Sequence, residues 1–220
     1  MKDALQFGIS GEGSAAIKIF LLMTALSFGP ALVMSVTSFL RIIIVLSFLR
    51  QALGSPQLPP NPVLVGLALF LSIFIMRPTL ERIHDDALRP YLADEIPYQQ
   101  ALDGTSVALK AFMLPQTRED DIALFYDISQ EARPASLADI PIGIAVPAFM
   151  VSELTTSFRM GLFLFIPLLL IDLLVAAILM SFGMMMVPPQ MIALPLKIGV
   201  FLLADGWHLV IASLARSFHG

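Results

Sequence analysis

The run MGLFLFIPLLLIDLLVAAILMSFGMMMV, residues Met160–Val187, is the longest stretch of this chain with almost no charged residues. Its 28 residues exceed the roughly 20 that a helix needs to cross a bilayer. It is rich in Leu, Met, Ala and Phe and too long for a strand, which predicts a helix. Asp172 and Pro167 interrupt it, and a charge in hydrocarbon is costly. We therefore expect a hydrophobic helix that packs against other helices and is not surrounded by lipid alone.

The other apolar runs are interrupted in the same way. Ser14–Met76 is broken by Gly29-Pro30 and by the loop GSPQLPPNP at Gly54–Pro62. Within it, Val63–Met76 has 14 residues between two prolines, too few to span a bilayer. Prolines also punctuate the last third of the chain, at Pro147, Pro167, Pro188, Pro189 and Pro195. The pattern predicts an all-α fold of broken and kinked hydrophobic helical hairpins.

Composition indicates that this chain does not cover its own apolar surface. Hydrophobic residues make up 57% and charged residues only 14%, with a mean hydropathy of +0.85. Soluble domains have about half apolar and a quarter charged residues. Lipid or partner subunits must therefore cover much of the surface. We expect the helices to pack mainly against other helices, some from other chains; the alternative is an ordinary four-span membrane protein with kinked helices.

Charge divides the chain into three regions. Residues 77–140 hold 12 of the 17 acids and 6 of the 13 bases. They predict a mixed, acidic helical segment outside the cytoplasm, between apolar helical regions at 1–76 and 141–220. Within it, Thr117 precedes three acids and an apolar run, so we expect it to cap a helix there. No basic stripe is present, which argues against nucleic-acid binding.

No pattern of catalytic or metal-binding residues is present in the sequence. The absence of cysteine excludes disulfides and thiolate sites, and His84, His208 and His219 lie far apart. No nucleotide-binding, serine-hydrolase or metalloprotease motif occurs. We predict that the chain is not an enzyme and has no cofactor and no metal site.

The most distinctive string is SFGMMMVPPQM, residues Ser181–Met191. Three consecutive helical residues spread over about 200°, so the three methionines cannot share one helix face. Gly183 before them and Pro188 after them indicate that a helix ends here. Methionine is flexible and polarizable. A non-helical cluster of Met184, Met185 and Met186 is therefore typical of a soft constriction, and simple core filling is the alternative.

A few charged residues interrupt the apolar runs: Arg41, Glu153, Arg159, Asp172, Lys197 and Asp205. Glu153 and Arg159 are six residues apart and would point to different faces of one helix, so each is expected to pair with another element. We predict structural ion pairs or interhelical hydrogen bonds. A proton or ion path through Asp172 and Glu153 is the alternative.

Five long strings resemble one protein family, the FliP/SctR family of type III export-apparatus proteins. They are SFLRIIIVLSFLRQALG (Ser38–Gly54), PPNPVLVGLALFLSIFIM (Pro59–Met76), FMLPQTREDDIALF (Phe112–Phe125), PAFMVSELTTSFRMG (Pro147–Gly161) and FIPLLLIDLLVAAILMSFGMMMVPPQMIALPLKIGVFLLADGW (Phe165–Trp207). Together they cover most of residues 30–218. The strings GMMMVPP and DGWHLVIASLARSF favour the flagellar branch over the injectisome branch.

The resemblance implies a core pore-forming and gating subunit of the flagellar export apparatus, needed for export of flagellar proteins and flagellum assembly. Family members form a five-copy ring with FliQ and FliR subunits, in a helical complex at the inner membrane and flagellar basal body, much of it on the periplasmic side. Other export-apparatus membrane proteins, membrane lipid and unfolded flagellar cargo are the further partners implied. In the family the methionine string narrows the pore, which corresponds here to Met184, Met185 and Met186.

One feature departs from the family, and two other functions stay open. Family members begin with a cleavable signal, whereas Met1–Gly13 is too polar for one. An ion or small-solute transporter and a pure assembly scaffold are the alternatives to an export gate.

Overall fold

The structure is a computed structural model that describes residues 19–20, 23–24, 27–55, 57–134, 136–184 and 186–218. Within these ranges every regular element is a helix, which confirms the all-α prediction. The segment in which we sought a signal, the gate residue Met185 and His219 lie outside the described residues.

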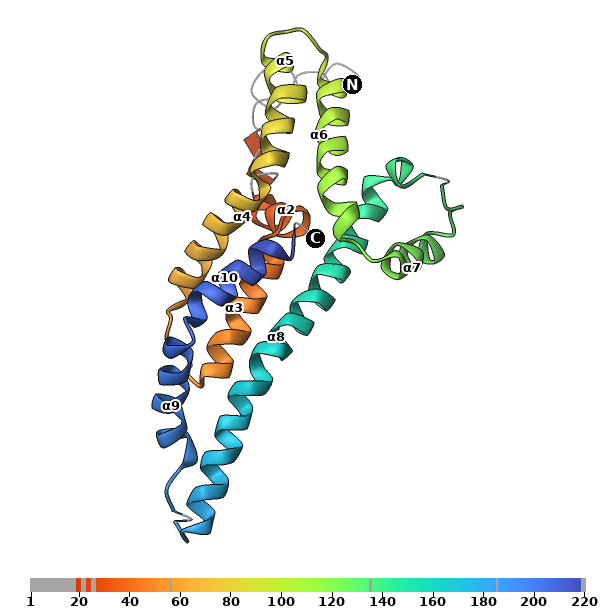
Figure 1. The fold of residues 1–220 in the computed structure, drawn as a ribbon. Coiled ribbons are helices and arrows are strands. Elements are labelled where there is room, and N and C mark those ends of the chain that lie inside the picture. Colours follow the sequence, from red (N-terminus) through yellow and green to blue (C-terminus); the bar gives the residue numbers. More distant parts are fainter. Residues whose placement is uncertain are drawn as a thin grey trace, which may run out of the picture.

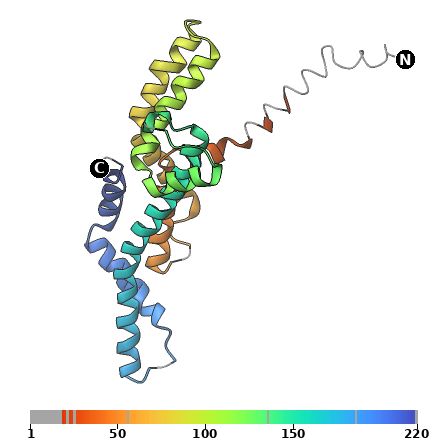
Figure 2. The same cartoon turned by 90° about the vertical axis from the view of Figure 1, so that its right-hand side faces the viewer.

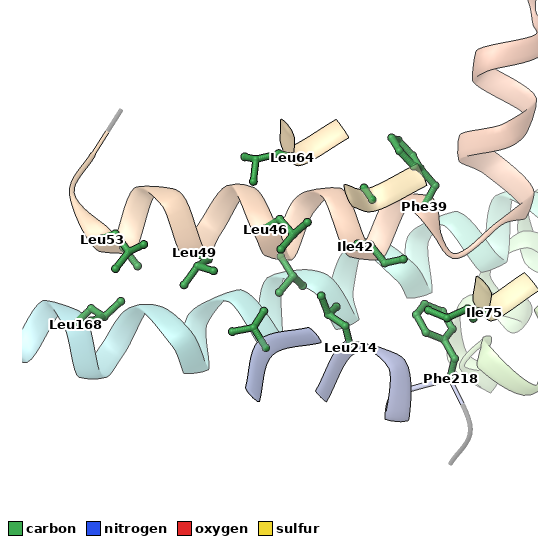
Figure 3. Packing of buried hydrophobic residues seen from close by; sticks show 14 residues of the cluster. Phe39, Ile42, Leu46, Leu49, Leu53, Leu64, Ile75, Leu168, Leu214 and Phe218 are labelled. Atoms are coloured by element: carbon green, nitrogen blue, oxygen red, sulfur yellow. The ribbon is translucent and has the colours of Figure 1, made fainter. Parts of the chain in front are cut away.

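Helix α3 (Phe39–Leu53) lies at the centre of the packing (Figures 1 and 3). It follows α2 (Gly29–Val36) after a bend of 85°, and it ends at Gly54, whose φ of 80° is the left-handed conformation that suits glycine at a helix end. Figure 3 shows Leu64 of α4 on one side of α3, with Leu168 of α8 and Leu214 of α10 on the other.

Helix α4 (Asn61–Ile83) continues through a π-helical turn (His84–Leu88) into α5 (Arg89–Leu92). The expectation that the apolar run ends before Pro78 was wrong, because Asn61–Leu92 is one helix of 32 residues. Pro78 is exposed, while the buried face of the helix includes Ala68, Met76 and Thr79. Burial of that face offsets the hydrogen bond that proline removes.

Helix α6 (Tyr98–Met113) runs back beside α4 and α5 at one end of the molecule (Figure 1). A 3₁₀ turn (Leu114–Gln116), α7 (Glu119–Ser129) and a second 3₁₀ turn (Leu137–Asp139) follow. The acids that we placed in the first turn of α7 are there, but Thr117 does not cap it. Its hydroxyl donates to the Met113 carbonyl at 2.8 Å, and Arg118 takes the cap position.

Helix α8 (Ile142–Ser181) has 40 residues and passes through both Pro147 and Pro167, so the breaks expected there do not occur. Pro167 is exposed, as is Phe163, the residue whose carbonyl loses its hydrogen-bond donor. Helix α9 (Pro189–Leu203) returns along α8, and α10 (Gly206–Arg216) follows after a bend of 64° (Figures 1 and 2).

Two helices in the described part of the chain, Asn61–Leu92 and Ile142–Ser181, are long and apolar enough to cross a membrane. The expectation that the apolar run at Val63–Met76 is too short to span a bilayer was therefore wrong, because the helix extends beyond this run at both ends. This chain buries just 33% and 17% of their most apolar windows. The rest needs lipid or other protein. We expected region boundaries after residues 76 and 140. The first position lies inside α4, whereas the second lies just before α8 begins at Ile142.

Candidate functional site

The described residues on both sides of Met185 lie in a loop at the end of the molecule that is opposite the α5–α6 turn (Figure 1). Helix α8 ends at Ser181, Gly183 adopts a φ of 73°, and α9 begins at Pro189. Met184 is 46% exposed and Met186 is 97% exposed. Core filling within this chain does not account for these two side chains.

The first buried ion pair joins Arg41 of α3 to Glu153 of α8, which are 2% and 0% exposed. Arg41 Nε donates to Glu153 Oε2 at 2.9 Å, and Nη2 pairs with Oε1. This two-point contact is the strong geometry for a guanidinium and a carboxylate. Glu153 therefore pairs with another helix and not with Arg159.

Further groups complete the surroundings of Arg41. Its Nη1 donates to the carbonyl and hydroxyl oxygens of Ser217 at 2.9 and 3.0 Å, and Nη2 donates to Gln116 Oε1 at 3.2 Å. The Phe218 ring lies 3.8 Å from the guanidinium carbon, within the range of a cation–π contact. One cation thus connects α3, α8, the turn after α6 and the segment after α10.

The second ion pair joins Lys197 of α9 to Asp172 of α8. Lys197 is buried, and its Nζ also donates to the Ala52 carbonyl at 3.0 Å in the last turn of α3. Unpaired carbonyls at a helix C-terminus attract a cation. Lys197 therefore bridges three helices.

A third polar cluster lies where α7 packs on α8. The Ser152 hydroxyl donates to Asp121 Oδ2 and accepts from the Arg118 backbone N–H at 3.0 Å. Sequence reasoning missed Asp121, because nothing in a run of surface-like acids marks the one that is buried. Nearby, burial and the charge of Glu131 raise the pKa of the Tyr126 phenol, whose hydroxyl has no partner among the described residues.

Two of the predicted polar residues lie apart from these clusters. Arg159 and Asp205 are exposed, and neither forms an ion pair with a described residue. Asp205 instead forms the bend between α9 and α10, with a φ of 51°. No group of three metal-ligating side chains occurs within the described ranges.

These features define a class of protein: an all-helical, membrane-associated subunit with bent apolar helices, charges paired inside the helix packing, and large apolar faces left for other molecules. The family model described as the FliP family matches residues 22–214. The chain belongs to the FliP family.

Characterised relatives agree over nearly the whole chain. The flagellar biosynthetic protein FliP of Bacillus subtilis (strain 168) is 48% identical over 205 residues, covering 93% of each chain. The FliP of Pectobacterium carotovorum is 48% identical, over 93% of this chain and 79% of its own. The FliP of Aquifex aeolicus is 44% identical, over 94% of this chain and 89% of its own.

Proposed function

We propose that this chain is a core pore-forming and gating subunit of the flagellar protein-export apparatus, needed to export flagellar proteins and build the flagellum. Its relatives are named flagellar biosynthetic proteins, which supports this role and the flagellar over the injectisome branch. The observation that carries the gating part is the exposed methionine loop at the tip of the α8–α9 hairpin.

Met184, Met185 and Met186 form the gate in this proposal. The side chain of Met186 is almost fully exposed, and moving such an apolar side chain out of water lowers the free energy. When several copies bring their loops together, the flexible thioethers close on one another. A hydrophobic constriction of this kind stops ions by excluding water.

The partners follow from the uncovered faces. The C-terminal half of α8 has a series of large apolar side chains that are exposed in this chain: Phe163, Leu169, Leu170, Leu173 and Leu174. In the proposal these faces meet further copies in a five-copy ring, FliQ and FliR subunits, and lipid. Unfolded flagellar proteins pass as cargo, other export-apparatus membrane proteins are further partners, and the energy for transport comes from elsewhere.

We further propose that the complex lies at the inner membrane and the flagellar basal body. Its acidic segment, residues 77–140, lies on the periplasmic side, between the apolar regions at 1–76 and 141–220. The role is one of binding and gating, with no catalysis by this chain.

Conductance through the reconstituted complex tests the gate. Replacing Met184, Met185 and Met186 together by Ala removes the thioethers and shortens each side chain. We expect the complex to assemble in normal amounts and to leak small ions. Met34→Ala is the matched control, because Met34 is 42% exposed but belongs to α2. An assembled triple variant whose conductance equals that of the unmodified complex would refute the gate.

The transporter alternative receives no support from the contacts of its two carboxylates. Glu153 is fully buried against Arg41, and Asp172 is held by Lys197. Neutralising both should abolish solute uptake into proteoliposomes if the chain were a transporter, and we expect no uptake even before the substitution.

A further inference from the structure

The lower half of the α8–α9 hairpin projects away from the packed body of the molecule. Figure 1 shows α8 extending well beyond the end of α3, with the methionine loop at its tip. Between the ion pair of Asp172 and Lys197 and the loop, a single small apolar cluster among the described residues joins the two helices. Its buried members are Val175, Leu179 and Ala193. Within one chain the hairpin is thus attached to the packed body at one end, and we refer to it as a lever.

The ion pair lies at the anchored end of this lever. Lys197 donates to Asp172 of α8 and, at 3.0 Å, to the Ala52 carbonyl at the end of α3. Lys197 is 4% exposed, whereas the Asp172 side chain is 36% exposed. One buried ammonium group therefore holds both helices of the hairpin against the last turn of α3.

Both helices of the hairpin are weakened next to this contact. Pro167 lies five residues before Asp172 in α8, and Pro195 lies two residues before Lys197 in α9. Each proline removes one backbone hydrogen bond and makes its helix easier to bend at that point. The direction of the hairpin therefore depends more on the side-chain contact than it would in two uninterrupted helices.

Small rotations at the pair become large displacements at the loop. Asp172 and Ser181, the last residue of α8, are nine residues apart, which corresponds to about 14 Å of helix. A tilt of about 10° at the pair moves the end of α8 by about 2 Å. That distance is comparable to the size of a methyl group, and it is enough to open or close contacts between thioethers.

We infer that Asp172 and Lys197 are positioning residues for the methionine gate: their ion pair sets the angle of the α8–α9 hairpin and hence the spacing of the loops. The inference rests on the proposed function, because the loop must be the gate for its spacing to matter. The pair acts through the hairpin and does not itself line the path.

Crosslinking between copies measures the spacing directly. The chain has no cysteine, so Met186→Cys introduces one thiol per copy at a fully exposed position. A disulfide forms only when the two Cα atoms come within about 7 Å. In the assembled complex under mild oxidation, we expect Met186→Cys copies to crosslink. Adding Asp172→Asn, which removes the charge and keeps the shape, should lower the crosslinked fraction at least threefold.

Charge-conserving and distant variants separate positioning from general damage. Asp172→Glu keeps the carboxylate at a position whose side chain is 36% exposed, and it should restore most of the crosslinking. Glu81→Gln breaks an exposed ion pair with Arg77 on α4 and should change nothing. Without the added cysteine, Asp172→Asn should raise the small-ion leak several-fold and leave the recovery of the complex unchanged.

Each outcome decides one question. If the methionine-to-alanine variant leaks while Asp172→Asn leaves crosslinking and conductance unchanged, the positioning role is refuted and the gate stands. If Asp172→Asn lowers crosslinking but the alanine variant does not leak, the gate is refuted and the hairpin geometry stands. Loss of the whole complex with Asp172→Asn would make the pair a folding contact and overturn the inference.

Discussion

Glu153→Gln is expected to destabilise the chain strongly, because it leaves the Arg41 cation buried opposite a neutral group. Removing one partner of a buried ion pair costs about 3–5 kcal/mol. Arg41 keeps its bonds to Ser217 and Gln116 and its contact with Phe218. We therefore expect the lower end, about 3 kcal/mol. For a chain of this length that lowers Tm by about 6–12 °C, measured by circular dichroism of the detergent-solubilised complex.

A double variant tests whether the cost arises from the pair. Arg41→Met combined with Glu153→Met removes both charges, and replacing a buried pair by apolar residues is neutral or stabilising in other proteins. The double variant should therefore be more stable than Glu153→Gln alone. The exposed pair of Arg77 and Glu81 is the control, since solvent screens its charges and breaking it should leave Tm almost unchanged. A double variant whose Tm falls as far as that of Glu153→Gln, or further, would refute the reasoning.

Four further substitutions give expected changes in the free energy of unfolding, measured by the same thermal assay. Gly161→Ala should cost about 1–3 kcal/mol, because its new Cβ would lie 2.6 Å from the Phe48 ring. On the same helix Gly143→Ala meets nothing within 4 Å and should stabilise by about 0.5–1 kcal/mol, so equal shifts at the two sites would contradict the packing argument. Phe149→Ala empties a fully buried position and should cost about 3–5 kcal/mol. Tyr126→Phe removes a hydroxyl with no partner among the described residues. It should change the free energy of unfolding by less than about 1 kcal/mol, in either direction.

The sequence was sufficient to predict the helical class and the end of α8, because both depend on local signals. Apolar runs longer than any strand indicate helices, and Gly183 followed by two prolines marks a helix end. Interior prolines misled us at Pro78, Pro147 and Pro167. Pro78 and Pro167 are exposed and leave the packed face of their helices intact, and the sequence alone does not show which face is packed. Pro147 is half-buried, and α8 continues through it as well.

The charged residues of the site were recognisable, but their partners were not. Arg41 and Glu153 are separated by 112 positions, so only the tertiary fold brings them together. A buried charge in an apolar run indicates that a partner exists. It carries no information on where that partner lies, and Gln116 and Ser217 gave no signal of their own.

The hydrogen bonds of Arg41 also bear on how the chain is made. Arg41 belongs to an early helix, yet Ser217, which accepts two of its bonds, comes 176 positions later. During synthesis, nearly all of the described chain must be made before Arg41 can form its hydrogen bonds to Ser217. Until then the growing polypeptide carries a guanidinium whose Nη1 lacks its two Ser217 acceptors, and chaperones and proteases can act on such an incompletely packed chain.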